Sequence, residues 1–201
     1  MTGSWFGGEG GESFEDFLDR FFGPGAPRRP VQRLNIARLM SEPARQLLRQ
    51  AVERAVDWRS ADLDTDHMLW AATRQEPTRQ LLTRVGADPQ AIAEEAERTA
   101  GHGTLKDGLP QLTPAGKRAL MDAHHISRVL GASYIGPEHI LFALAVNPDS
   151  PAGRILGTAR IFPEALQSAA GGGGGPPPVL RAQPAHPVQV CTDDLKRRGA
   201  C

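Results

Sequence analysis

The sequence lacks the features of a secreted or membrane-spanning protein. Its only two cysteines are Cys191 and Cys201, both in a polar stretch near the C-terminal end, so a fold held by disulfides is not expected. No apolar run approaches the roughly 20 residues that span a bilayer. The first residues have neither the basic start nor the apolar stretch of a secretory signal. We therefore expect a soluble, cytoplasmic protein that makes no membrane contact.

The sequence also lacks an excess of charge and any motif of catalysis. It has 23 Lys and Arg residues against 23 Asp and Glu residues, which argues against nucleic acid as a partner. No phosphate loop of the form G-x-x-x-x-G-K-[ST] is present, and the nearest fragment, residues 114–118, lacks the first Gly and the Ser or Thr. No C-x-x-C or H-E-x-x-H spacing indicates a metal site. We expect a protein that is not an enzyme and that needs no cofactor and no metal.

What the sequence does contain is an internal repeat. The segment that begins at Ser41 recurs without a gap from Thr113, 72 positions later. Several identities recur in this register: Leu48 with Leu120, Ala51 with Ala123, His67 with His139, and Leu69 with Leu141. A repeat of this length indicates a duplicated helical unit, so any binding site is expected twice.

Each unit has the pattern of four helices. In the first unit, one helix carries the apolar stripe from Leu47 to Val56, and the later helices are expected to begin after Thr65 as N-cap, at Pro77, and at Asp88-Pro89. In the second unit, the starts are Thr113-Pro114, Glu138, Ser150-Pro151 and the region of Pro163. Strand patterns are absent. We predict an all-α fold of two tandem, pseudo-symmetric four-helix repeats, residues 34–100 and 110–170, which form one domain over 34–170.

Both flanking segments differ from the repeats. Within residues 1–33, a short amphipathic helix is expected over 13–22, with its apolar residues at helical spacing: Phe14, Phe17, Leu18, Phe21 and Phe22. Such a short helix needs a surface to dock on, which is either its own domain or a partner. Residues 171–201 begin with GGGGGPPP, a composition typical of a disordered tail.

Two motifs connect the repeat to a known family. The second-helix starts read LDTDHML from Leu63 and IGPEHIL from Ile135, each preceded by a Ser-x-x-Ala or Thr-x-x-Gly helix start. In this pattern the chain resembles the N-terminal domain of Clp/Hsp100 ATPases, especially the ClpC type, over roughly residues 37–170. The resemblance implies a module that receives substrates and adaptors for an ATP-driven unfoldase and its protease.

The resemblance also implies where a ligand binds. ClpC-type domains bind phosphorylated arginine, one pocket per repeat, and the matching residues here are Ser41 with Asp66 and Thr113 with Glu138. A carboxylate suits the guanidinium group, and a helix start with a hydroxyl suits the phosphate. The residues alone leave a structural alternative open, because a Ser or Thr before a helix is ordinarily an N-cap. For His67 and His139, the recurrence favours a structural hydrogen bond.

From these observations we predict a non-catalytic protein-binding module for Clp-dependent quality control. Its expected partners are Clp ATPase or protease components and adaptor, substrate or phosphoarginine-marked proteins. The alternative is the N-terminal fragment of a ClpC-type ATP-dependent unfoldase subunit of the Clp protease.

Overall fold

The computed structural model describes residues 36–103, 105 and 108–170 of the chain. Within this part, the expected all-α fold of two four-helix repeats is confirmed. Repeat one consists of α2 (Glu42–Asp57), α3 (Thr65–Arg74), α4 (Thr78–Arg84) and α5 (Pro89–Thr99). Repeat two consists of α6 (Pro114–Val129), α7 (Pro137–Val146), α8 (Pro151–Thr158) and α9 (Pro163–Ala170). A 3-10 helix, η1 (Ile36–Leu39), precedes α2.

Four of the eight α-helices of the described residues are capped by the side chains that the sequence indicated. A side-chain oxygen immediately before the helix accepts a hydrogen bond from a backbone N–H of the first turn, which satisfies a group that has no partner inside the helix. The bonds are Ser41 with Ala44 N at 3.3 Å, Asp88 with Gln90 N at 2.9 Å, Thr113 with Gly116 N at 2.9 Å, and Ser150 with Gly153 N at 3.0 Å.

The predicted N-cap of α3 is wrong by one residue. Asp64, not Thr65, is the cap, and its carboxylate accepts from Thr65 N at 2.6 Å. The third helical residue, His67, places its Nδ1 atom 3.3 Å from the Asp64 backbone N, as in a capping box. Thr65 is thereby the first helical residue. Its hydroxyl instead accepts from the N–H of Ala152 in repeat two, at 3.2 Å.

The two repeats are joined by backbone pairing that the sequence pattern did not predict. The short strands β1 (Asp62–Leu63) and β2 (Gln111–Leu112) pair in parallel, and the N–H of Thr113 donates to the carbonyl of Leu63 at 3.1 Å. At the equivalent place, Met40 bridges Ile135, and the N–H of Ser41 donates to the carbonyl of Ile135 at 2.9 Å. The expectation that strands are absent is therefore corrected by one two-residue ladder.

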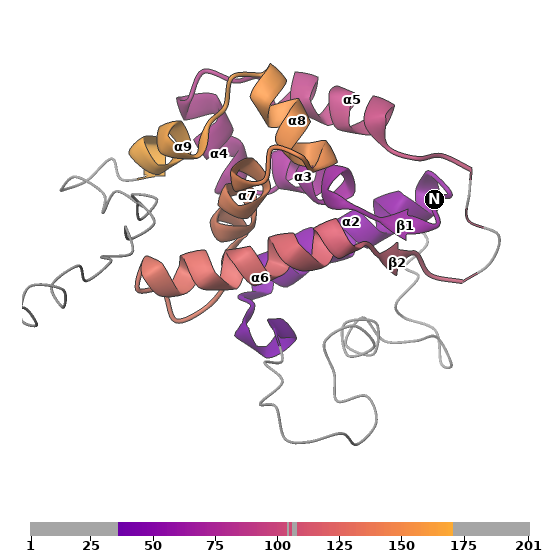
Figure 1. Ribbon diagram of the computed structural model, residues 1–201, viewed down its shortest axis with the longest axis horizontal. Helices are drawn as coiled ribbons and strands as arrows, with labels where there is room; N and C mark the ends of the chain where they lie inside the picture. Colours follow the sequence, from indigo (N-terminus) through magenta and orange to yellow (C-terminus); the bar gives the residue numbers. More distant parts are fainter. Residues whose placement is uncertain (1–35, 104, 106–107, 171–201) are drawn as a thin grey trace, which may run out of the picture.

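This pairing sets α2 and α6 antiparallel. The start of α2 meets the segment that follows α6, and the start of α6 meets the segment that follows α2. In Figure 1, α6 crosses the front of the molecule with α2 running behind it, and β1 and β2 lie together at one end. The starts of α2 and α6 are thus each held by the opposite repeat.

The core lies around the two second helices. Nine of the ten residues of α3, Thr65 to Thr73, are buried, and most of α7 is buried as well. α3 packs against α2, α4, α5, α7 and α8, which makes it the central helix (Figure 1). Fully burying a leucine such as Leu69 or Leu141 contributes about 1.5–3 kcal/mol.

Two predicted segments, the helix at 13–22 and the tail at 171–201, lie outside the described residues. Within the described ranges, no helix has the length and apolar character needed to cross a bilayer.

Two glycines of α8 provide a matched test of the packing. A Cβ added at Gly153 would collide with the backbone carbonyl of Asn147, whereas a Cβ at Gly157 would meet nothing within 4 Å. We expect Gly153→Ala to lower the free energy of unfolding by about 1–3 kcal/mol because backbone must move. Gly157→Ala is expected to raise it by about 0.5–1 kcal/mol because alanine loses less entropy in a helix. Urea unfolding measures both, and equal effects of the two variants would contradict the packing.

Candidate functional site

The structure places the four predicted site residues at two ends of the antiparallel α2–α6 pair. Thr113 caps the start of α6, while α7 with Glu138 begins after the other end of that 16-residue helix, about 24 Å along its axis. Ser41 and Asp66 are separated by the length of α2 in the same way. The predicted pairs Ser41 with Asp66 and Thr113 with Glu138 are therefore not brought together.

The backbone pairing brings together the opposite pairs. Ser41 donates its N–H to Ile135, three residues before Glu138. Thr113 donates its N–H to Leu63, three residues before Asp66. Each end thus combines a hydroxyl cap from one repeat with an acid from the other. We call them the Ser41–Glu138 end and the Thr113–Asp66 end.

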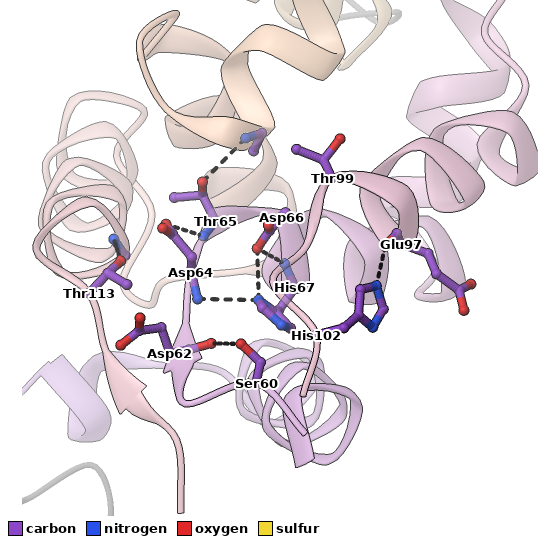
Figure 2. A network of polar contacts seen from close by, with 12 residues as sticks. Ser60, Asp62, Asp64, Thr65, Asp66, His67, Glu97, Thr99, His102 and Thr113 are labelled. Atoms are coloured by element: carbon purple, nitrogen blue, oxygen red, sulfur yellow. Dashed lines mark hydrogen bonds and ion pairs between the residues drawn. The ribbon is translucent and has the colours of Figure 1, made fainter. Parts of the chain in front are cut away.

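At the Thr113–Asp66 end the acid is closed in. The side chain of Asp66 is 5% exposed, its Oδ1 atom accepts from the backbone N–H of His67 at 2.7 Å, and the same oxygen lies 2.7 Å from Nδ1 of His67. Figure 2 shows Asp64, Asp66 and His67 gathered at the start of α3, with Thr113 on the neighbouring segment. This carboxylate is held by its own helix and serves the structure of repeat one.

At the Ser41–Glu138 end the acid reaches the surface. The side chain of Glu138 is 32% exposed, and its carboxylate folds back over the Cα of Gly136, where any Cβ would collide with it. Its Oε1 atom lies 3.4 Å from Nδ1 of His139. A carboxylate in this position remains open to a cationic group from outside.

The two ends also differ in the fourth helix of each repeat. In repeat one, the 11-residue α5 packs extensively on α3. The chain then continues over Trp58: the N–H of Gly103 bonds the Trp58 carbonyl at 3.0 Å, and the His102 ring lies 5.4 Å from the Trp58 ring. In repeat two, the eight-residue α9 packs on both α4 and α7, and its contact with α7 is much smaller than that of α5 with α3.

Gly136 is a residue of this site that the sequence analysis did not single out. It occupies the N-cap position of α7, where repeat one has Asp64, and Pro137 is the first helical residue. Without a side chain at position 136, the carboxylate of Glu138 can lie across the backbone. The repeat alignment contains this difference, because Asp64 of repeat one aligns with Gly136 of repeat two.

The recurrent histidines make the structural hydrogen bonds that the repeat predicted. Nδ1 of His139 accepts from the N–H of Gly136 at 2.8 Å, as His67 does from Asp64. Because an N–H can only donate, Nδ1 of His139 is unprotonated and the imidazole is neutral. Burial lowers the pKa of His139, and the nearby Glu138 carboxylate opposes this in part.

This histidine makes stability depend on pH. Below the ordinary histidine pKa of about 6.5, the unfolded chain binds a proton that folded His139 resists, so stability falls as the pH drops. We expect His139→Gln, which keeps an acceptor at the capping position, to lose less stability than the wild type between pH 7 and pH 5.

Urea unfolding at pH 8, 7, 6 and 5 measures this difference. His124, whose pKa is lowered by burial and by Arg128 and His125, remains in the variant, so its pH dependence shrinks without vanishing. Parallel stability curves for the two proteins would contradict the neutral state assigned to His139.

The sequence of this chain is similar to the N-terminal regions of known Clp proteins. The model of the Clp repeat (R) N-terminal domain matches residues 39–159. The chaperone protein ClpB of Oceanobacillus iheyensis is 30% identical over 118 residues, which are 58% of this chain and 15% of the relative. The negative regulator of genetic competence ClpC/MecB of Bacillus subtilis is 29% identical over the same shares. The chain thus corresponds to about one seventh of the length of these relatives.

Solved structures share the fold. The N-domain of ClpV from Vibrio cholerae superposes with a TM-score of 0.60 at 15% identity, over 72% of this chain and 90% of that one. The Hsp104 N-terminal domain from Candida albicans gives 0.57 at 18% identity, over 65% and 88%. With the family model covering more than half of the sequence, the chain belongs to the Clp repeat N-terminal domain family.

Proposed function

We propose that this domain is a non-catalytic protein-binding module that presents substrate or adaptor proteins to a Clp ATPase. The observation that carries the proposal is the Ser41–Glu138 end, where a capped helix start and a partly exposed carboxylate from the other repeat meet. A ClpV N-domain, which superposes on this chain with a TM-score of 0.54, has been solved in complex with a VipB peptide. That complex shows that this fold can present a surface to a peptide.

The ligand chemistry that fits this end is a phosphorylated arginine. The Glu138 carboxylate can accept two parallel hydrogen bonds from a guanidinium group. The start of α2 offers the hydroxyl of Ser41 and the positive end of a helix to the phosphate. Both groups of one modified side chain would be recognised, each by a different repeat.

The Thr113–Asp66 end is proposed to bind no ligand of this kind. Its carboxylate is buried and accepts a hydrogen bond from a backbone N–H of its own helix. A guanidinium would have to displace these contacts first. We therefore propose one open pocket, although the duplication supplies the residue pattern twice.

The second candidate is that the chain is part of a ClpC-type unfoldase subunit. It matches only 14–15% of the length of relatives that include "ATP-dependent Clp protease ATP-binding subunit ClpC" of Staphylococcus epidermidis. A phosphate-loop sequence in the adjoining coding DNA, in any frame, would favour this candidate. Adjoining coding DNA without a phosphate-loop sequence would favour a binding module that acts alone.

Calorimetric titration with free phosphoarginine tests the proposed pocket. We expect one site, and we expect Glu138→Gln to weaken binding by at least about tenfold, because a hydrogen-bonded charge pair contributes roughly 1.5–3 kcal/mol. Asp66→Asn is expected to bind normally while losing stability. Glu164→Gln, an exposed acid of α9, serves as the matched control and should change neither property.

Two outcomes would contradict this proposal. Loss of binding in Asp66→Asn with normal binding in Glu138→Gln would place the ligand at the Thr113–Asp66 end instead of the Ser41–Glu138 end. No binding by the wild type would remove phosphoarginine as the ligand. An unmodified substrate or adaptor peptide would then remain for the protein-binding role, to be tested on the same variants.

A further inference from the structure

A mixed apolar and basic surface on α6 has no partner among the described residues. Met121 is 48% exposed and Val129 is 43% exposed. They are eight residues apart, with the exposed His125 midway between them, so all three lie along one side of the helix. We call this side, with Arg118 and Arg128, the outer face of α6. A solvent-exposed helix face is ordinarily polar, so two large apolar residues in one stripe indicate a contact surface.

The charge of this face is positive. Arg118, His125 and Arg128 are all exposed, and the exposed Arg38 belongs to η1, which packs against α6. The nearest acid of the helix, Asp122, is turned toward α7, where its Oδ2 atom accepts from the side-chain amide of Asn147 at 2.8 Å. The face therefore suits a segment that is apolar on one side and acidic at its edges.

Such a segment exists in the same chain. Residues 13–22 carry five apolar residues at helical spacing, together with three acids and one arginine: Glu15, Asp16, Asp19 and Arg20. The segment has an apolar side that needs a surface and a net negative charge. Both properties are complementary to the outer face of α6.

The connection between the segment and the face is short. Residues 23–35 separate the segment from Ile36, and these 13 residues span up to about 45 Å when extended. Ile36 begins η1, which lies against α6, and α6 itself is about 24 Å long. Every part of the face is within reach, and a tether of this length holds the segment at a millimolar effective concentration.

From this complementarity and tethering, we propose that residues 13–22 dock in cis on the outer face of α6 as an amphipathic helix. Their apolar side would cover Met121 and Val129, and their acids would face Arg118 and Arg128. The inference goes beyond the protein-binding role and does not depend on the Ser41–Glu138 end.

Disulfide trapping in the full chain tests this docking. In a Cys191→Ser, Cys201→Ser background, we compare Leu18→Cys with Met121→Cys against Leu18→Cys with Arg98→Cys. Arg98 lies on α5 with a side chain that is 76% exposed, so this second pair reports on tethering without docking. We expect an intramolecular disulfide to form at least about tenfold faster with position 121 than with position 98.

Two further variants separate docking from proximity. Phe17→Asp with Phe21→Asp should bring the position-121 rate down to the control rate, and Arg118→Glu with Arg128→Glu should slow it. Equal rates for the two cysteine pairs would overturn the proposal and leave the face free for a partner protein. Disulfide-linked dimers in place of the intramolecular product would also overturn it, because they would assign the face to a second copy of the chain.

Discussion

The fold depends on an exchange of backbone hydrogen bonds between the two repeats. Thr113 bonds Leu63, and Ser41 bonds Ile135, so the N-terminal end of each first helix is fixed by the segment that follows the first helix of the other repeat. Buried backbone groups must find partners, and here those partners lie in the opposite unit. The antiparallel setting of α2 and α6, the central place of α3 and α7, and the composition of both candidate sites all follow from this exchange.

Duplication produced two ends of similar pattern that now differ in accessibility. The fourth helices differ as well, because α5 packs on α3 over a larger contact than α9 makes with α7. The acid at the covered end, Asp66, is held by its own backbone. The acid at the open end, Glu138, is partly exposed, and its carboxylate lies over the backbone of Gly136, where a Cβ would collide with it. The two copies therefore hold carboxylates that differ in their exposure to solvent.

The sequence predicted most of the fold, because its information lies in local patterns. Ser41, Asp88, Thr113 and Ser150 each cap the helix that they were expected to cap. The cap of α3 was misplaced because Asp64 and Thr65 are both suitable residue types, and the choice depends on His67 completing the capping box. The pairing of the site residues was not predictable from the repeat, because it depends on one two-residue ladder and one isolated bridge, which are too short to show a periodic pattern.

We expect the exchanged pairing to make the two repeats one cooperative unit, and urea unfolding of a Leu141→Ala variant tests this expectation. In a Trp5→Phe background the fluorescence comes from Trp58 and Trp70, both buried in repeat one, whereas Leu141 is buried in repeat two. The substitution should cost about 2–5 kcal/mol. If the two repeats unfold as one unit, the fluorescence transition shifts by the same free energy as the helical circular dichroism signal. A fluorescence transition that stays in place while the circular dichroism transition splits would show that the repeats unfold separately, and would contradict a single cooperative unit.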